Sequence, residues 1–330
     1  MEGRMFRSIM NRRWTQVLGL GILAAFSCKA GSPSERFEFE KPGMGTLFRI
    51  SLYAQDFETA RSAAERAFTR MQHLERELSD WDADSAVRKL PFAGGRVNVS
   101  QDLWDILFLS IRVAEATKGA FDPTVGPVVK LWRRASRQQK LPATEDIEAA
   151  LEAVGWGHMD LIDETEINLG VPGMRLDFGG IGKGFALDAM LGVLGEEGIA
   201  SALVDGGGDV AVSNPPPGQQ GWRVAIESPP WYSGEQLRLL LANQAIASSG
   251  TRFRKFQVDG RTWSHLLDPR TGMALDYDIQ ATALAPSGAL ADSLASAACV
   301  LGPEGWQNNS LASKWRGVKT WWFHPDEALE

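Results

Sequence analysis

Asp292 and Ser296 stand four residues apart in an apolar run, Ala289 to Leu301, that has the pattern of a helix. Side chains at this spacing lie on one face of a helix, so their oxygen atoms could meet at one cation. Mg²⁺ prefers oxygen ligands and often shares them with phosphate oxygens, and a backbone carbonyl from a glycine turn could be a third ligand. The alternative is structural, because an Asp followed by a Ser near a helix start is also a plausible capping sequence.

A second chemical feature is the stretch from Leu176 to Asp188, which reads Leu-Asp-Phe-Gly-Gly-Ile-Gly-Lys-Gly-Phe-Ala-Leu-Asp. Four glycines in six positions allow backbone N–H groups to approach an anion where a helix begins, and Lys183 could add a positive charge. The spacing matches neither the P-loop nor the dinucleotide-binding fingerprint. Phosphate binding and a tight strand-to-helix connection are both open interpretations.

Two further side chains could contribute to a site. His265 is one of four histidines, and it follows a strand pattern beside Asp268-Pro269-Arg270, where an imidazole could accept a proton. Trp81, within Ser-Asp-Trp-Asp, could stack on a flat ring system. The alternatives are a structural histidine at a strand end and, in a chain with 12 tryptophans, an indole packed in the core.

Regular elements must position these residues. The glycine stretch predicts a strand over 174–178, a turn, and a helix that Gly198 closes. A helix-rich first third followed by mixed elements predicts an α+β fold with mixed sheets and flanking helices. The hydrophobic patterns predict helices at about 57–78, 101–118, 144–155, 289–301 and 304–312, and strands at 46–53, 159–162, 166–169, 202–205, 210–213, 222–227, 237–241, 245–248, 253–258, 261–267, 280–285 and 318–323.

Eight motifs in order make the sequence resemble the ApbE family, the FAD:protein FMN transferases. Together they span about residues 40 to 325, and the resemblance implies two lobes with flavin bound in a cleft between them. The motifs are Met44-Gly45-Thr46, Ser79-Asp80-Trp81 through Ser85, Gly119-Ala120-Phe121-Asp122-Pro123-Thr124-Val125-Gly126-Pro127, Asp177 to Gly184, Gly206-Gly207, Ser248-Ser249-Gly250, Ser264-His265 to Gly272, and Ala291-Asp292 to Ser296.

The resemblance also implies roles for single residues. Asp292, Ser296 and the carbonyl of Gly182 would bind Mg²⁺, although the family usually has threonine at the position of Ser296 and often alanine at that of Gly182. His265 would be catalytic, as a base or as a stabiliser of the transferring phosphoryl group, with Asp177 as the rival base. The implied contacts to the flavin or its pyrophosphate are Met44, Trp81, Ala120, Phe121, Asp122, Gly179 and Lys183, of which Phe121 could equally belong to the core.

The implied reaction is a phosphoryl transfer that depends on Mg²⁺. A Thr or Ser hydroxyl of an acceptor protein would attack the FMN phosphorus of FAD, and AMP would leave. Two alternatives stay open. Water as the nucleophile would make the chain an FAD pyrophosphatase that yields FMN and AMP, and loss of chemistry would leave an exported lipoprotein that only binds flavin.

Composition limits the partners. The chain has 330 residues, 44% of them hydrophobic, and a formal net charge of −7. This balance argues against a nucleic-acid partner and is compatible with a divalent cation. Cys28 and Cys299 are its two cysteines, and Cys299 falls in an apolar helical run, so a structural disulfide is not expected.

The N-terminus predicts export. Residues 1–28 have the form of a signal peptide: four arginines precede an apolar run, Val17 to Phe26, that is too short to span a bilayer. Small residues before Cys28 resemble a bacterial lipoprotein signal, which predicts a membrane-anchored protein facing the periplasm. Cleavage without lipidation is the alternative, because Ala25 replaces the usual leucine. Polar residues 29–41 are expected to form a tether, and 42–330 the flavin transferase domain.

Overall fold

The computed structural model describes residues 34–251, 255–258, 260–309 and 315–323. The signal segment and Cys28 lie outside these described residues. From Ser34 onward the chain forms one compact unit of helices and sheets, which confirms the predicted α+β class. The helices are α2 (Phe57–Leu78), α3 (Gln101–Thr117), α4 (Gly126–Gln138), α5 (Thr144–Leu151), α6 (Gly182–Glu196) and α7 (Gly288–Gln307), with short 3₁₀ turns at Val87–Lys89 and Trp156–His158.

The main sheet has seven strands in the order β1-β2-β6-β7-β10-β15-β16, and each neighbouring pair is antiparallel. These strands are β1 (Glu35–Gly43), β2 (Thr46–Ala54), β6 (Ala202–Gly206), β7 (Asp209–Val212), β10 (Gln244–Gly250), β15 (Gln280–Ala285) and β16 (Lys319–Phe323). Apolar side chains alternate along β2, where Phe48, Ile50 and Leu52 are all fully buried. The alternation directs one face of the sheet into the core.

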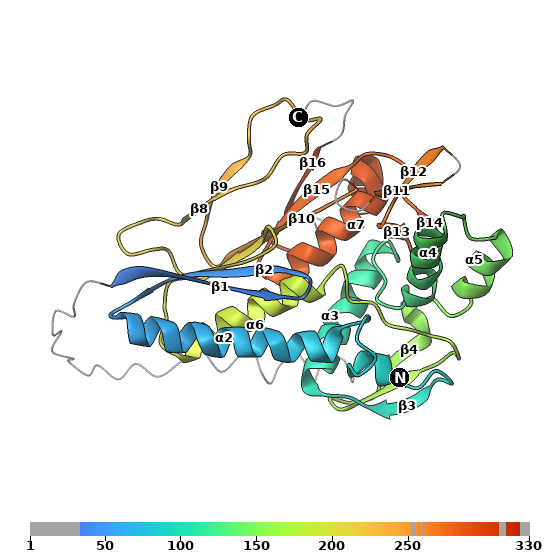
Figure 1. Cartoon of the computed structure of the whole chain (residues 1–330), viewed down its shortest axis with the longest axis horizontal. Coiled ribbons are helices and arrows are strands. Elements are labelled where there is room, and N and C mark those ends of the chain that lie inside the picture. Colours follow the sequence, from blue (N-terminus) through green and yellow to red (C-terminus); the bar gives the residue numbers. More distant parts are fainter. Residues whose placement is uncertain (1–33, 252–254, 259, 310–314, 324–330) are drawn as a thin grey trace. The chain divides into compact units, whose positions relative to one another are not determined.

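Helices α2, α6 and α7 cover that face and enclose the largest core cluster, which also includes side chains of α3 and β5. Figure 1 shows α2 and α6 on the opposite side of β1 and β2 from the hairpin of β8 (Trp222–Ala225) and β9 (Arg238–Leu241). That hairpin covers the other face of the sheet around Trp222, Val224 and Leu241. Because the main cluster runs through the helices without a break, the two expected lobes share one core.

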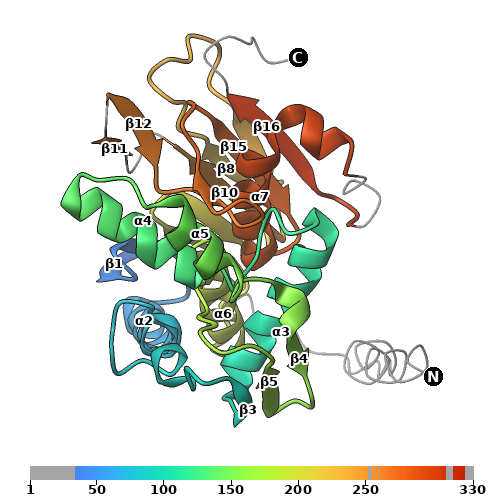
Figure 2. The ribbon, with the colours of Figure 1, turned by 90° about the vertical axis from the view of Figure 1, so that its right-hand side faces the viewer.

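Smaller sheets complete the fold. One has three strands in the order β3-β5-β4: β3 (Gly95–Asn98), β4 (Met159–Leu161) and β5 (Glu166–Leu169). In Figure 2 it lies at the bottom, with α6 between it and the main sheet. The pairs β11 (Lys255–Val258) with β12 (Arg261–Ser264) and β13 (Leu267–Asp268) with β14 (Met273–Ala274) are the remaining two sheets, and they enclose a cluster with α4 and α5. Among the described residues, no helix has both the length and the apolar character that a membrane span requires.

The structure corrects the predicted boundary of the tether. Residues 35–41 belong to β1, which pairs with β2 along its whole length, so the folded unit begins before residue 42. The sequence Glu-Arg-Phe-Glu-Phe-Glu-Lys looks like a linker because of its charge. It is an edge strand, however, whose Phe37 and Phe39 both pack against Phe57 at the start of α2.

The strand predicted over 174–178 does not form. Burial alternates as in a strand, with Met174, Leu176 and Phe178 buried, but the backbone pairs only through an isolated bridge between Arg175 and Val125. The Asp177 N–H donates to the carbonyl of Pro123 instead, at 2.8 Å. The segment is therefore an extended connection held between the α4 region and the glycine turn.

The sequence patterns also missed α4, whose buried positions Val128, Trp132 and Ala135 form a narrow apolar stripe. Near the C-terminus the expected break between two helices is confirmed, because Gly302 has a φ of 64° just before Pro303. The predicted end of the second helix, residues 310–312, lies outside the described residues.

Candidate functional site

The glycine turn forms a sharp corner that two other elements touch. The Gly182 N–H donates to the Phe178 carbonyl at 2.7 Å, which closes the turn as α6 begins. A Cβ atom on Gly180 would lie 2.9 Å from the Ser296 Oγ, and one on Gly182 would lie 3.7 Å from the Met44 Cε. The turn therefore contacts α7 on one side and the β1–β2 turn on the other.

Met44 reaches the turn from a strained position. Its φ is 47°, in the left-handed region, and it precedes Gly45, which also has a positive φ. The Met44 N–H donates to the Glu75 Oε1 of α2 at 2.7 Å, which fixes the β1–β2 turn to that helix. Its side chain is thereby placed beside the start of α6.

Asp292 lies beside the first turn of α6 and is 5% exposed. Its Oδ2 accepts a hydrogen bond from the Gly184 N–H at 3.1 Å, and its Oδ1 lies 3.6 Å from the Lys183 Nζ. Burial raises the pKa of Asp292 to about 6, while the Lys183 ammonium acts in the opposite direction and the Asp209 carboxylate adds to the increase. The carboxylate is thus buried without full compensation of its charge.

Lys183 joins two carboxylates. Its ammonium forms an ion pair with Asp209, which is 2% exposed and whose Oδ1 accepts from the Ser248 N–H at 3.1 Å. Although burial opposes protonation, Asp209 and Asp292 raise the pKa of Lys183, so it stays charged. Two carboxylates around one ammonium leave a net negative charge in a buried place, and such a place favours a bound cation.

Ser296 completes the oxygen donors. It lies one helical turn after Asp292 on α7, faces the glycine turn, and its Oγ lies 3.4 Å from the Ser249 Oγ of β10. The structure therefore brings Asp292 and Ser296 together beside the glycine turn and the first turn of α6, which begins at Gly182. These donors fit Mg²⁺ in kind, being carboxylate, hydroxyl and backbone oxygen. In the described part of the chain no cluster of three or more His, Cys, Asp or Glu side chains could hold a metal, and the predicted set contains one carboxylate only.

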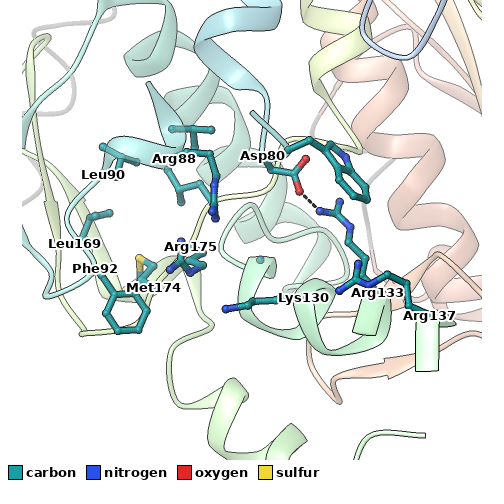
Figure 3. Close-up of a pocket in the computed structure, with 14 residues that line it drawn as sticks. Asp80, Arg88, Leu90, Phe92, Lys130, Arg133, Arg137, Leu169, Met174 and Arg175 are labelled. Atoms are coloured by element: carbon teal, nitrogen blue, oxygen red, sulfur yellow. Dashed lines mark hydrogen bonds and ion pairs between the residues drawn. The ribbon is translucent and has the colours of Figure 1, made fainter. Parts of the chain in front are cut away.

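Trp81 is a surface residue and not part of the core. It is 66% exposed, and the Arg133 guanidinium lies over its ring at 4.0 Å from the centroid. Arg133 also forms an ion pair with Asp80, drawn as a dashed line in Figure 3, and its Nη2 lies 3.3 Å from the Asp177 Oδ2. The guanidinium covers one face of the indole, and an exposed indole of this kind can stack on an aromatic ligand through its other face.

Asp177 connects this arginine to the glycine turn. Its Oδ1 accepts from the Gly179 N–H at 2.8 Å while its Oδ2 faces Arg133. Burial raises the pKa of Asp177 to about 6, with a further increase from Asp80 and an opposing effect from Arg133. Both oxygens have internal partners, so the carboxylate holds the turn and Arg133 in place. The base role expected as an alternative for Asp177 stays a prediction.

Ala120, Phe121 and Asp122 are all buried in the connection between α3 and α4. Phe121 contacts the turn, because a Cβ on Gly180 would lie 3.5 Å from its Cε2. The carboxylate of Asp122 accepts from the Thr124 hydroxyl at 2.6 Å and from the Trp156 N–H at 2.9 Å. Burial raises the pKa of Asp122. The carboxylate of Asp122 thus organises its own loop, and the flavin contacts expected of the three residues stay predictions.

His265 is exposed in the bend that follows β12. The next residue, Leu266, packs against the cluster that contains Ala298 and Cys299, which follow Ser296 on α7. Farther along the loop, Arg270 pairs with Asp268 at 2.8 Å and lies against Gly119. The loop that carries His265 is therefore fixed to the helix of the metal candidates, while the catalytic role of His265 stays a prediction.

The sequence patterns left Asp209 and Arg133 without a role. Asp209 directly follows the Gly206-Gly207-Gly208 turn, and its position next to a glycine motif could have marked it as a candidate site residue. Its ion pair with Lys183 could not be predicted, because only the fold brings the two residues together. Arg133 lies on α4 with Lys130 and Arg137 at helical spacing. This spacing was a signal, but it could be recognised only if the segment was predicted to be a helix, and it was not.

Comparisons with known proteins agree with this geometry. The model of the ApbE family matches residues 44–317. The FAD:protein FMN transferase of Treponema pallidum is 30% identical over 337 residues, covering 94% of this chain and 92% of that protein, and the enzyme of Escherichia coli K12 is 30% identical over 272 residues, covering 79% and 77%. The crystal structure of the ApbE protein from Thermotoga maritima superimposes with a TM-score of 0.79 at 29% identity, covering 90% of this chain and 96% of that one.

Proposed function

Because the chain belongs to the ApbE family and is a FAD:protein FMN transferase, we propose that the site around Asp292 carries out this transfer with Mg²⁺. The observation that carries the proposal is the buried group of Asp292, Lys183 and Asp209 against the glycine turn. Its net negative charge suits a cation, and its ammonium and the α6 N-terminus suit a pyrophosphate. One site can thus hold both a metal and the diphosphate of FAD.

The reaction is a displacement at phosphorus. The hydroxyl oxygen of an acceptor Thr or Ser forms a bond to the FMN phosphorus, the bond from that phosphorus to the bridging oxygen breaks, and AMP leaves. Asp292, Ser296 and the Gly182 carbonyl would hold Mg²⁺, whose chemistry is to neutralise the pyrophosphate charge. Positioning and charge neutralisation are expected to supply most of the lowering of the barrier.

The chain's own groups supply the remaining steps. We assign the acceptor's hydroxyl proton to His265, which is exposed where another protein could reach it. Asp177 keeps the glycine turn and Arg133 in place. The exposed face of Trp81 would stack on the flavin or adenine ring. We extend the proposal to an acceptor outside the chain and, from residues 1–28, to a lipid anchor at Cys28 in the periplasm.

Transfer is tested with purified mature protein, FAD, Mg²⁺ and an acceptor protein. We expect AMP release together with covalent flavin on the acceptor, detected by mass spectrometry, and loss of both when EDTA is present. Full AMP release without acceptor, and no protein-bound flavin with it, would establish the pyrophosphatase alternative. Tightly bound FAD that stays intact would establish a binding protein. A covalent FMN adduct on this chain itself would refute the separate acceptor.

The assignment of the base is tested by pH profiles. His265→Gln should lower the transfer rate by roughly 10²-fold or more and remove the limb of the profile that reports the base, while FAD affinity stays close to normal. Asp177→Asn is the comparison. If Asp177→Asn removes the basic limb and His265→Gln does not, the roles of the two residues are reversed.

A further inference from the structure

A recess opens beside the glycine turn, and Trp81 and Arg133 of the candidate site line it. It encloses about 200 Å³ and lies between α4, the 3₁₀ turn Val87–Lys89 and the segment before the glycine turn. In Figure 3 the apolar residues Leu90, Leu169, Phe92 and Met174 lie on the left. Arg88, Arg175 and Lys130 lie in the middle, and Arg133 and Arg137 lie on the right. Five cationic side chains line this pocket, which we call the basic pocket, against one carboxylate, that of Asp80.

The spacing on α4 creates one wall of the basic pocket. Lys130, Arg133 and Arg137 follow each other at intervals of three and four residues, so they share one face of the helix. The opposite face is the buried stripe around Trp132 that packs on β12. Since the apolar stripe fixes the helix's rotation, all three cations must face the pocket.

Most of this positive charge has no carboxylate partner among the residues that the structure describes. Arg133 pairs with Asp80 and Asp177, but among the described residues Arg88, Lys130, Arg137 and Arg175 have no carboxylate within ion-pair distance. Arg175 lies over the Phe92 ring at 5.0 Å, and its pKa is lowered by burial and then by nearby Arg88. A chain with a net charge of −7 thus places around one recess four cations that have no carboxylate partner in its described part.

The basic pocket adjoins the reaction site through Arg133. The same guanidinium lines the pocket, covers Trp81 and contacts Asp177, which in turn holds the glycine turn. A polypeptide that brings a hydroxyl to the flavin phosphorus must cross the neighbouring surface. We propose that the basic pocket binds an acidic segment of the acceptor protein, and this inference rests on the proposed function.

The lining of the pocket favours a peptide over a free nucleotide. Cations from three separate segments line it together with apolar side chains such as Leu90 and Met174, and this mixture matches a chain that contains both carboxylates and apolar residues. The four cations without a carboxylate partner would dock the acceptor and raise its encounter rate. Trp81 and Arg133, which also line the pocket, keep their proposed role toward FAD.

The first test uses octaglutamate as the probe on the mature full protein at low salt. Calorimetric titration should show binding that Lys130→Gln/Arg137→Gln weakens by about tenfold. The control, Lys140→Gln/Arg223→Gln, removes the same charge from exposed positions outside the pocket and should bind as the wild type does. Glutamine favours helix on α4, and equal melting temperatures would show that the variants are folded.

The second test uses the transfer reaction itself. The pocket variant should raise the KM for the acceptor about tenfold and reduce its salt dependence, with an unchanged KM for FAD. A matching rise in the KM for FAD, or tighter competition by inorganic phosphate than by octaglutamate, would overturn the inference in favour of a phosphate site. Equal kinetics of variant and wild type would also overturn it. Absence of transfer by the wild type would instead contradict the proposed function.

Discussion

Gly184 of α6 and Gly288 of α7 bring two helix backbones into direct contact. A Cβ atom on Gly184 would lie 2.1 Å from the Gly288 carbonyl oxygen, and one on Gly288 would lie 2.5 Å from the Gly184 carbonyl oxygen. The Gly184 N–H also donates to Asp292, which follows Gly288 by one helical turn. The crossing of the helices therefore sets where the proposed metal ligand meets the glycine turn.

Gly184→Ala should consequently damage both stability and the site. The added methyl group would meet backbone atoms that cannot move separately, so we expect a loss of about 1–3 kcal/mol in the free energy of unfolding. Gly192→Ala is the control on the same helix, where a Cβ meets nothing within 4 Å and helix propensity should stabilise the protein by about 0.5–1 kcal/mol. Urea denaturation measures both, and equal effects would contradict the close crossing.

Asp292→Asn should separate activity from stability. The asparagine keeps the shape but removes the anionic ligand, so the transfer rate at limiting Mg²⁺ should fall by roughly 10²-fold or more. Stability without metal should be preserved or increased at pH 7, because burial raises the pKa of Asp292 and its ionised form is costly. Near-normal transfer at limiting Mg²⁺ would show that the metal ligand is assigned wrongly.

Arg133→Met should weaken FAD binding. It removes the cation above Trp81 and leaves Asp80 and Asp177 without their shared partner, so we expect the Kd for FAD to rise about tenfold. Arg134→Met is the matched control at the next position of α4, where the side chain is exposed and pairs only with Asp146 at 3.2 Å among the described residues. Fluorescence titration with FAD would refute the role of Arg133 if both variants bind alike.

Asp188 should make stability depend on pH. Its two carboxylate oxygens accept from the N–H groups of Gly288 and Ala289, at 2.6 and 2.9 Å, and burial raises its pKa to about 6 against 3.8 for the free group. The folded state therefore binds the proton more tightly than the unfolded state, so the contribution is favourable below about pH 4 and is lost as the pH rises to about 6.

Comparing the wild type with Asp188→Asn separates the contribution of the Asp188 carboxylate from that of all other titrating groups. The stability of the wild type minus that of the variant should fall by up to about 3 kcal/mol between pH 4 and pH 7. Denaturation with urea at several pH values measures the difference. A difference that stays constant, or that grows with pH, would show that the two backbone N–H groups outweigh burial.

The sequence by itself determined the elements whose periodicity is strong. Helix α7 with Asp292 and Ser296 on one face, the glycine turn before α6 and the long apolar stripe of α2 are all local patterns, because side chains at helical spacing share a face in any fold. The eight motifs in order also identified the family, and the match over 44–317 confirms it.

Where the sequence pattern is weak, the structure of a segment depends on the elements that pack against it. Strand β1 is rich in charge because an edge strand needs only one packed face, and it exists because β2 pairs with it. The residues 174–178 have the alternation of a strand but no neighbour along their length, so they stay an extended connection. Helix α4 has an apolar stripe too narrow to stand out alone.

Only the tertiary structure decided the electrostatics of the site. The ion pair of Lys183 with Asp209 joins residues 26 positions apart, and Arg133 reaches Asp80 and Asp177 from a third segment. Charge pairing depends on distance and burial, and neither is encoded in the spacing of a motif. The sequence therefore named most of the residues of the candidate site, while packing of the glycine turn against α7 determined which of them share one buried place.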